Sequence, residues 1–327
     1  MALKFINTKG VSLSMAPFLA LDTYDYSDDP NTISVTSLMK PARSIILGIQ
    51  NPGVEKEVEL MEMAPSAMGS AMHARLEAAW KDRDLVNDIL STYGYKHLLD
   101  KIDINPETTD PERMAIYTER RFKRKLSNGY TLTGQADLIV NGYLHDLKTC
   151  SVWSAIYDSN AEDYKLQGSL YRWLSDGLIT EDVIIIEMLF TDWSKTAALK
   201  DTQSYPQTRI LNKEYPLMSM EETEAYIMDK LATIEDFMDA AQSELPQCTK
   251  EELWQTDPKY KYFKSPTSKR ATKVYTNSQE AYDRMNSEGC GLVKEFPGEV
   301  KRCNYCPVVD ICDQAKTMEQ QGLLNRI

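Results

Sequence analysis

The sequence has no long apolar run and carries less positive than negative charge. No stretch of its 327 residues approaches the 18 consecutive apolar residues that a membrane-spanning helix needs, so we expect no membrane anchor. Ser12 and Ser14 interrupt the one faint resemblance to a signal peptide, at the start. Lysine and arginine number 37 against 49 acidic residues, which gives a net charge of −12. This balance excludes a basic coat for nucleic acid over the whole surface, but not a local basic groove.

Cysteine is also scarce. Six cysteines in a chain of this length are too few for a disulfide scaffold, and most of them lie near the end, two as a C-x-x-C pair. This distribution favours a reducing compartment and a bound metal. Disorder is excluded because 42% of the residues are hydrophobic and 9% are aromatic, enough to bury a full core.

Hydrophobic periodicity predicts a mixed α/β core. Apolar residues recur at helical spacing in some segments and alternate or run continuously in others. The helices are expected over residues 65–82, 161–174 and 220–241, and the strands over 115–119, 130–133, 136–140, 143–147 and 183–190. Beyond Pro246 the composition shifts to lysine, tyrosine, threonine and cysteine. We therefore expect two domains, 1–245 and 246–327.

Two carboxylates and a lysine fall in this strand region. Asp146 and Lys148 are two apart and share a face of their strand, whereas Leu147 is expected to point into the core. An antiparallel neighbour would bring Asp137 beside them. Carboxylates of this kind hold Mg²⁺ or Mn²⁺ for phosphodiester hydrolysis, and the lysine can orient water or offset developing charge. The alternative is an exposed ion pair between Asp146 and Lys148, worth little.

Four short motifs occur together with this site. They are Gly69-Ser70-Ala71-Met72-His73, Gly134-Gln135-Ala136-Asp137, Asp146-Leu147-Lys148-Thr149 and Gln167-Gly168-Ser169-Leu170-Tyr171. In this order they resemble the PD-(D/E)XK nuclease superfamily, specifically its RecB-type branch, which includes CRISPR-associated and phage RecB-like exonucleases. The resemblance covers roughly residues 34–190 and implies an α/β, restriction-endonuclease-like core.

The resemblance also implies roles for individual residues. His73, Asp137 and Asp146 would be metal ligands, with the backbone carbonyl of Leu147 completing the set. Lys148 would be the catalytic lysine. Gln167 and Tyr171, one helical turn apart, would contact the scissile region or the DNA backbone and orient the lysine. Glu77 and Glu119 stay undecided as further carboxylates, and His145 is expected to point to the opposite face.

A basic run precedes the predicted turn at residues 127–129. Residues 120–125 include five lysines and arginines on an expected strand. They could contact the phosphates of a DNA substrate, or they could simply keep an edge strand solvated.

The cysteine-rich end predicts a second metal site. Cys303, Cys306 and Cys312 have the spacing C-x2-C-x5-C, which suits three ligands of one metal group. Cys248, Cys290 and Cys150 are candidates for the fourth ligand. RecB-type nucleases often hold a 4Fe-4S cluster with such a motif, and the segment around Cys248 resembles the tail of phage RecB-like proteins, so we expect Cys248. Zinc is the alternative, because all four ligands would lie in one small domain.

These features predict a metal-dependent deoxyribonuclease, an exonuclease used in DNA recombination, repair or phage replication in the cytoplasm of a bacterial or phage-infected cell. The competing hypothesis is a non-catalytic nucleic-acid-binding module that keeps the fold. DNA is the expected substrate, with a helicase, a recombinase or a single-strand-binding protein as a possible partner. The motifs do not determine cleavage polarity, strand preference or oligomeric state.

Overall fold

The chain divides into two compact units. The computed structural model describes residues 3–22, 27, 29 and 31–326. One unit, here the sheet unit, comprises Lys4–Met39 and Glu57–Leu231; the other, the cysteine unit, comprises Lys40–Lys56 and the residues from Ala232 onward, with Leu3. The division differs from the expected boundary between residues 245 and 246, because the early segment Lys40–Lys56 folds with the cysteine-rich end.

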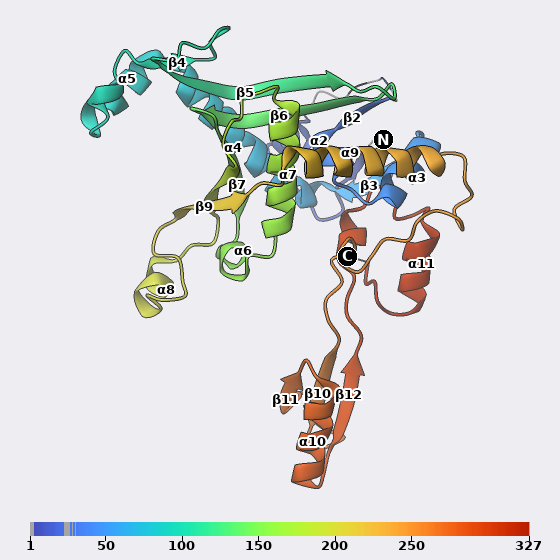
Figure 1. Cartoon of the computed structure of the whole chain (residues 1–327). Coiled ribbons are helices and arrows are strands. Elements are labelled where there is room, and N and C mark those ends of the chain that lie inside the picture. The colour runs from blue at the N-terminus through green and yellow to red at the C-terminus, as the bar shows by residue number, and fades with distance from the viewer. Residues whose placement is uncertain (1–2, 23–26, 28, 30, 327) are drawn as a thin grey trace. The chain divides into compact units, whose positions relative to one another are not determined.

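The sheet unit is built on a curled, seven-stranded mixed sheet, which confirms the expected α/β class (Figure 1). Its main order is β4 (Ile102–Ile104), β5 (Met114–Lys125), β6 (Thr131–Val140), β7 (Tyr143–Cys150), β8 (Val183–Phe190) and β9 (Ile210–Pro216), and β2 (Thr32–Ser34) pairs with β6. The two strands expected at 130–133 and 136–140 are a single strand, because Gly134 and Gln135 between them stay paired with β5.

One edge of β6 is shared by two different strands. β7 pairs antiparallel with Leu138, Ile139 and Val140, and β2 pairs parallel with residues 131–133. Between these two ladders the sheet forks, and Asp137 is the first residue of β6 beyond the β7 ladder. Asp137 therefore lies at the point where β6 and β7 separate.

Two helices bring the remaining motifs to this fork. α4 (Ala64–Lys81) and α7 (Ala161–Leu174) form as expected, and α7 packs on the sheet at close range. A Cβ atom added to Gly168 would lie 2.7 Å from Leu217, and one added to Gly134 would lie 2.7 Å from the Tyr171 ring. Both distances are too short for a real contact, so these glycines allow the helix to approach the sheet.

The rest of the sheet unit covers and extends the sheet. α5 (Arg83–Thr92) buries Val86 and Leu90 against Ile116 and Leu138 of the sheet. The other elements that begin in this unit, or at its edge, are β1 (Leu3–Ile6), α1 (Ala16–Ala20), α2 (Val35–Leu38), β3 (Lys56–Glu59), η1 (Leu60–Met63), η2 (Lys96–Leu98), α6 (Val152–Tyr157), α8 (Lys195–Lys200) and α9 (Met220–Asp236).

The last long helix is shorter than expected. The pattern predicted residues 220–241, but α9 ends at Asp236. The backbone nitrogens of Met238 and Ala240 donate to carbonyls three residues back, and the carbonyls of the same two residues accept hydrogen bonds from the Gln50 side chain. These contacts replace the hydrogen bonds of a further helical turn.

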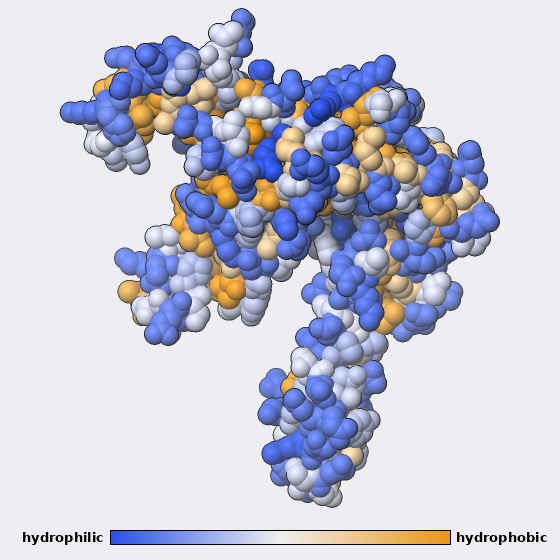
Figure 2. Space-filling view, viewed as in Figure 1, coloured by the Kyte–Doolittle hydropathy of each residue, from blue (hydrophilic) through white to orange (hydrophobic). Residues whose placement is uncertain are grey.

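The cysteine unit combines helices α3 (Ala42–Gln50) and α11 (Asp313–Gln320), the 3-10 turn η3 (Arg302–Tyr305) and a separate small module. The module comprises β10 (Lys259–Phe263), β11 (Lys273–Tyr275), α10 (Ser278–Glu288) and β12 (Leu292–Phe296), with the strand order β11-β10-β12. Tyr262 and Ala281 are fully buried between its sheet and α10. Figure 2 shows that the module's visible surface is almost entirely hydrophilic.

The two ends of the module, near Thr256 and Glu299, lie side by side where it joins the rest of its unit. The backbone nitrogen of Thr256 donates to the carbonyl of Glu299, and the backbone nitrogen of Glu299 donates to the Thr256 hydroxyl, both at 3.0 Å. The two chain segments approach so closely that a Cβ on Gly298 would lie 1.7 Å from the Thr256 carbonyl oxygen. Among the described residues, no helix is both long and apolar enough to cross a membrane.

Candidate functional site

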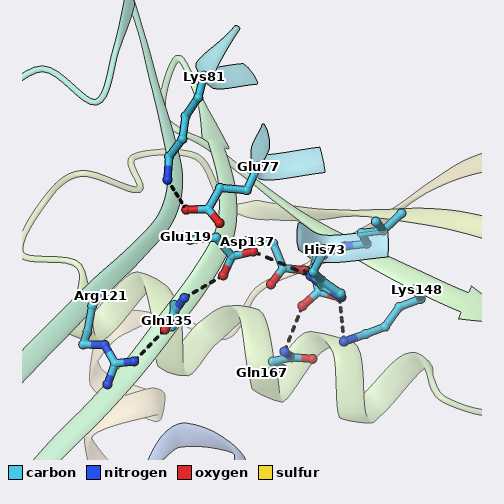
Figure 3. Close-up of polar contacts among 11 residues, drawn as sticks. His73, Glu77, Lys81, Glu119, Arg121, Gln135, Asp137, Lys148 and Gln167 are labelled. Carbon is cyan, nitrogen blue, oxygen red and sulfur yellow. Dashed lines mark hydrogen bonds and ion pairs between the residues drawn. The ribbon is translucent and has the colours of Figure 1, made fainter. Parts of the chain in front are cut away.

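Three ligand-type side chains meet at the fork of the sheet. His73 comes from the middle of α4, Glu119 from β5 and Asp137 from β6 (Figure 3). His73 Nδ1 lies 3.3 Å from Asp137 Oδ2 and 3.8 Å from Glu119 Oε1. Each of these three residues offers one ligand atom, and the three atoms lie within 4.8 Å of one another. One imidazole and two carboxylates at this spacing suit a single divalent cation such as Mn²⁺ or Mg²⁺.

Glu119 reaches this group through an unusual backbone conformation. Its φ is +47°, in the left-handed region that non-glycine residues rarely occupy, although its neighbours stay in register with β6. Gln135 donates a hydrogen bond of 2.7 Å to Glu119 and accepts one from Arg121. The motif glutamine therefore fixes the orientation of a carboxylate that is not part of any of the four motifs (Figure 3).

Asp146, Lys148 and Gln167 form a second, more buried group beside the first. Asp146 is only 3% exposed; its Oδ2 lies 2.6 Å from Lys148 Nζ, and its Oδ1 accepts a hydrogen bond of 2.9 Å from Gln167 Nε2 of α7. Asp146 and Lys148 thus share a face as expected. Their ion pair is not the exposed one considered as the alternative, because the covering helix removes Asp146 from solvent.

The two groups are joined through the backbone. The amide nitrogen of Leu147 donates to Asp137 Oδ2 at 3.0 Å. Leu147 itself is only half-buried, so the expectation that it points into the core is wrong; Asp146 is the buried member of this stretch. α7 covers this part of the sheet and also supplies Gln167, which satisfies the carboxylate there.

The electrostatics of the site follow from these contacts. The hydrogen bond with Asp137 raises the pKa of His73 against the effect of burial. Burial, then the charge of Asp137, raises the pKa of Glu119. Burial also raises the pKa of Asp146. Burial alone would lower the pKa of Lys148, but the charge of Asp146, its hydrogen bond with the lysine and the charge of Asp137 together raise it. A site with this surplus of negative charge favours a cation.

Tyr171 and His145 lie elsewhere. Tyr171 is 5% exposed, and its ring packs against Gly134 of β6. Its expected role toward the scissile region stays a prediction. His145 Nδ1 pairs with Glu187 of β8 at 2.9 Å, so it is occupied away from the candidate ligands, in line with its exclusion. Glu77 pairs with Lys81 on the surface of α4.

The sequence motifs leave Glu119 undecided and indicate no role for Gln135. No local signal indicates that a strand residue adopts a positive φ, so Glu119 could not be chosen over Glu77. Gln135 lies in a motif next to Asp137, and a polar side chain at that position was the one available hint.

The basic run lies on β5. β4 pairs only with Met114–Ile116, which leaves the second half of β5 as an edge. Arg124 stacks on the Trp173 ring at 4.1 Å and donates to the Trp173 carbonyl, so it has a structural role. Lys123 and Lys125 are exposed. Arg124 thus has neither of the two expected roles, and phosphate contact by the exposed lysines stays a prediction.

Four cysteines gather in the cysteine unit. The side chains of Cys248, Cys303, Cys306 and Cys312 line one small pocket, and all are free thiols. Among the described residues, no three of these sulfur atoms lie within 4.8 Å of one another. A single tetrahedral zinc ion, with bonds of about 2.3 Å, would hold its sulfur ligands about 3.8 Å apart. A cluster places several metal atoms between its sulfur ligands and so holds them farther apart than a single ion does.

The surroundings of these cysteines are mainly apolar, with one buried positive charge. Arg43 of α3 is 2% exposed; its Nε lies 3.4 Å from Cys312 Sγ, and its other nitrogens donate to the carbonyls of Gln242 and Leu245. Burial raises the pKa of Cys248 to about 12 and that of Cys303 to about 11. Without a metal these thiols stay protonated, and metal binding would release their protons.

The comparisons with known proteins add little to this geometry. No protein-family model matches the sequence, and no curated protein matches it. Among solved structures, the chain is similar to the crystal structure of SSO0001, with 15% sequence identity, a TM-score of 0.41, and coverage of 72% of this chain and 90% of that chain. A similarity of this size indicates no activity.

Proposed function

We propose that the chain is a divalent-metal-dependent deoxyribonuclease of the RecB type, with a PD-(D/E)XK core in its sheet unit. The observation that carries the proposal is the meeting of His73, Asp137, Asp146 and Lys148 at the fork between β6 and β7. These residues come from three separate motifs. An arrangement needed only for stability would not require a half-buried histidine, two carboxylates and a lysine to converge.

Mg²⁺ or Mn²⁺ is the proposed cofactor of this site. His73, Asp137 and Glu119 offer atoms close enough to hold the ion, and Asp146 with the Leu147 carbonyl would complete its ligands. A bound cation would polarise the scissile phosphate and lower the pKa of an attacking water. Glu119 is an addition to the set expected from the sequence.

The remaining residues orient the reacting groups. Asp146 holds the Lys148 ammonium 2.6 Å away, next to the fork, where the ammonium can donate to a phosphate oxygen as negative charge develops. Gln167 fixes the other oxygen of Asp146. Gln167 therefore acts on the lysine through Asp146, as a positioning residue.

We also propose a 4Fe-4S cluster on Cys248, Cys303, Cys306 and Cys312. The shared pocket supports a common metal group, and the lack of three sulfurs within 4.8 Å of one another among the described residues favours a cluster over a single zinc ion. The cluster would stabilise the cysteine-rich end of the chain, and no chemistry on the substrate is assigned to it.

Incubation with end-labelled linear DNA tests the catalytic proposal. Wild-type protein and Lys148→Ala are compared on single- and double-stranded DNA with Mg²⁺, with Mn²⁺ and with EDTA. We expect metal-dependent degradation by the wild type and loss of at least about 100-fold in rate in the variant, as for removal of a charge-stabilising donor. The products from each labelled end would reveal the polarity.

Lys101→Ala is the matched control, because this lysine is exposed and lies outside the site. Binding without cleavage under every metal condition would contradict the enzyme and support the non-catalytic module.

A further inference from the structure

A second pocket in the cysteine unit lies outside the catalytic proposal. Its volume is about 200 Å³, and it is lined by two aromatic side chains, Trp254 and Tyr305, and two cationic ones, Lys40 and Arg302. Three of the four cysteines, Cys248, Cys303 and Cys306, also line it. The pocket enclosed by all four cysteines is lined instead by aliphatic side chains such as Leu47 and Val309. The two pockets therefore share a wall but differ in chemistry.

The aromatic side chains of the pocket are exposed. Trp254 is 43% exposed and Tyr305 is 71% exposed, and their ring centroids are 6.1 Å apart at an interplanar angle of 55°. Leaving two large rings in contact with water forfeits the gain from burying them, which makes such pairs a mark of binding surfaces.

The backbone at Trp254 is strained. Trp254 has a φ of +49°, a left-handed conformation that is strained for a bulky residue. Its amide donates to the Glu251 carbonyl, and the next residue, Gln255, donates to the Lys250 carbonyl. The chain thus keeps a strained turn that presents the indole outward.

The positive charges lie beside the rings. The Arg302 guanidinium is 4.9 Å from the centre of the Trp254 ring, and the Arg302 amide donates to the Leu253 carbonyl, which fixes η3 against the tryptophan turn. Lys40 completes the lining of the pocket. The one acidic residue of the lining, Glu252, accepts a hydrogen bond from the Thr249 amide. The charge that faces a ligand is therefore mainly positive.

We propose that this pocket binds one unpaired nucleotide. The base would stack against Trp254 and Tyr305, and the phosphate would pair with Arg302 and Lys40. Stacking on aromatic side chains combined with cationic phosphate contacts is the chemistry of single-stranded nucleic-acid binding, and a base within a duplex could not enter. The proposal does not depend on cleavage at the sheet fork.

Binding of a fluorescent oligothymidylate tests it. The full chain, purified anaerobically to keep any metal on the cysteines and used without added divalent cation, is titrated at fixed salt. We expect Trp254→Ala and Tyr305→Ala each to weaken binding about 5- to 100-fold, as for loss of one stacked base. Trp254→Phe, which keeps a flat ring, should restore part of the affinity. Tyr305 is mostly exposed, so its replacement leaves the fold intact even where Trp254→Ala does not.

Charge variants test the phosphate contact. Arg302→Gln should lower the slope of log affinity against log salt by about 0.7, the value for one phosphate contact on a single strand. Tyr282→Ala and Arg284→Gln on α10 are matched controls, exposed but far along the chain in the small module, and should bind like the wild type.

Two further ligands distinguish a nucleotide within a single strand from a free nucleotide. A duplex of the same length should show no dependence on Trp254 or Tyr305. Binding of thymidine monophosphate at the pocket, with no binding of the oligonucleotide, would assign it to a free nucleotide rather than a strand. Wild-type affinity for both ligands in both alanine variants would overturn the proposal, whatever the result of the cleavage assay.

Discussion

At the scale of single residues, the site depends on one carboxylate held by a strained backbone. Glu119 has a positive φ, and the hydrogen bond from Gln135 aims it at His73 and Asp137. Strain of this kind persists only where the surrounding contacts enforce it, and it is common at functional sites.

Replacing this carboxylate should weaken metal binding. We expect Glu119→Gln to lower the affinity for Mn²⁺ about 10- to 100-fold, because one charged oxygen ligand or its orienting contact is lost. Calorimetric titration of the metal-free protein measures the change. Glu77→Gln is the control, one helical turn beyond His73 and paired with Lys81, and should bind like the wild type. Equal affinities in the two variants would contradict the role of Glu119.

Metal affinity should also depend on pH through His73. A metal binds the neutral imidazole, and the hydrogen bond with Asp137 raises the pKa of His73 above its ordinary value of 6.5. Mn²⁺ affinity should therefore fall as the pH falls through this raised pKa and level off above it. Titrations between about pH 6 and 8 measure the effect. His73→Asn should have a flatter profile; the same slope as in the wild type would exclude the histidine as a ligand.

At the scale of elements, the distance between α7 and the sheet decides whether Gln167 reaches Asp146. Gly168 on the helix and Gly134 on β6 allow this distance to be short. Packing of this closeness tolerates no additional methyl group without movement of the helix or its neighbours.

Two helical glycines should respond in opposite directions to the same change. Gly168→Ala should lower the free energy of unfolding by about 1–3 kcal/mol, because the new methyl group meets Ile184 and Leu217. Gly69→Ala in α4 meets only Thr149 at 3.6 Å and should raise the free energy of unfolding by up to about 1 kcal/mol, because alanine favours a helix. Urea denaturation measures both; destabilisation by Gly69→Ala of the same size would contradict the packing argument.

The same elements show what a sequence can predict. α7 and β8 have the expected bounds, because their apolar periodicity is strong and their packing is regular. Gln167 lies in α7, whereas Asp146 and Lys148 lie in β7, which extends three residues beyond its expected end; their convergence followed from motif order. Glu119 depends on one dihedral angle, and Arg43 meets Cys312 across 269 positions of the chain. Neither local angles of this kind nor long-range contacts leave a periodic signal.

At the scale of the whole molecule, stability of the cysteine unit should depend on the proposed metal cluster. α3 and the chain end contribute buried groups around four thiols, two of which have a pKa near 11 or 12 without metal. A ligand that replaces those protons adds its binding free energy to that of folding.

Removal of one cysteine should expose this dependence. Cys306→Ser should lose iron by elemental analysis and lower the Tm, whereas Cys290→Ser, at an exposed position outside the set of four, should keep both. Zinc in place of iron in the wild-type protein would contradict the cluster. The absence of both metals after anaerobic purification would contradict a metal site at these cysteines.

The small module of β10–β12 and α10 begins and ends at neighbouring points, Thr256 and Glu299, which hydrogen-bond to each other. Removing everything between them and closing the gap with a tight turn would leave Cys248 and Cys303 on their own sides of an intact junction. A foreign domain whose termini lie close together could be grafted there at small entropic cost. The junction between Thr256 and Glu299 is thus a site for domain insertion or replacement that leaves the residues around the cysteines unchanged.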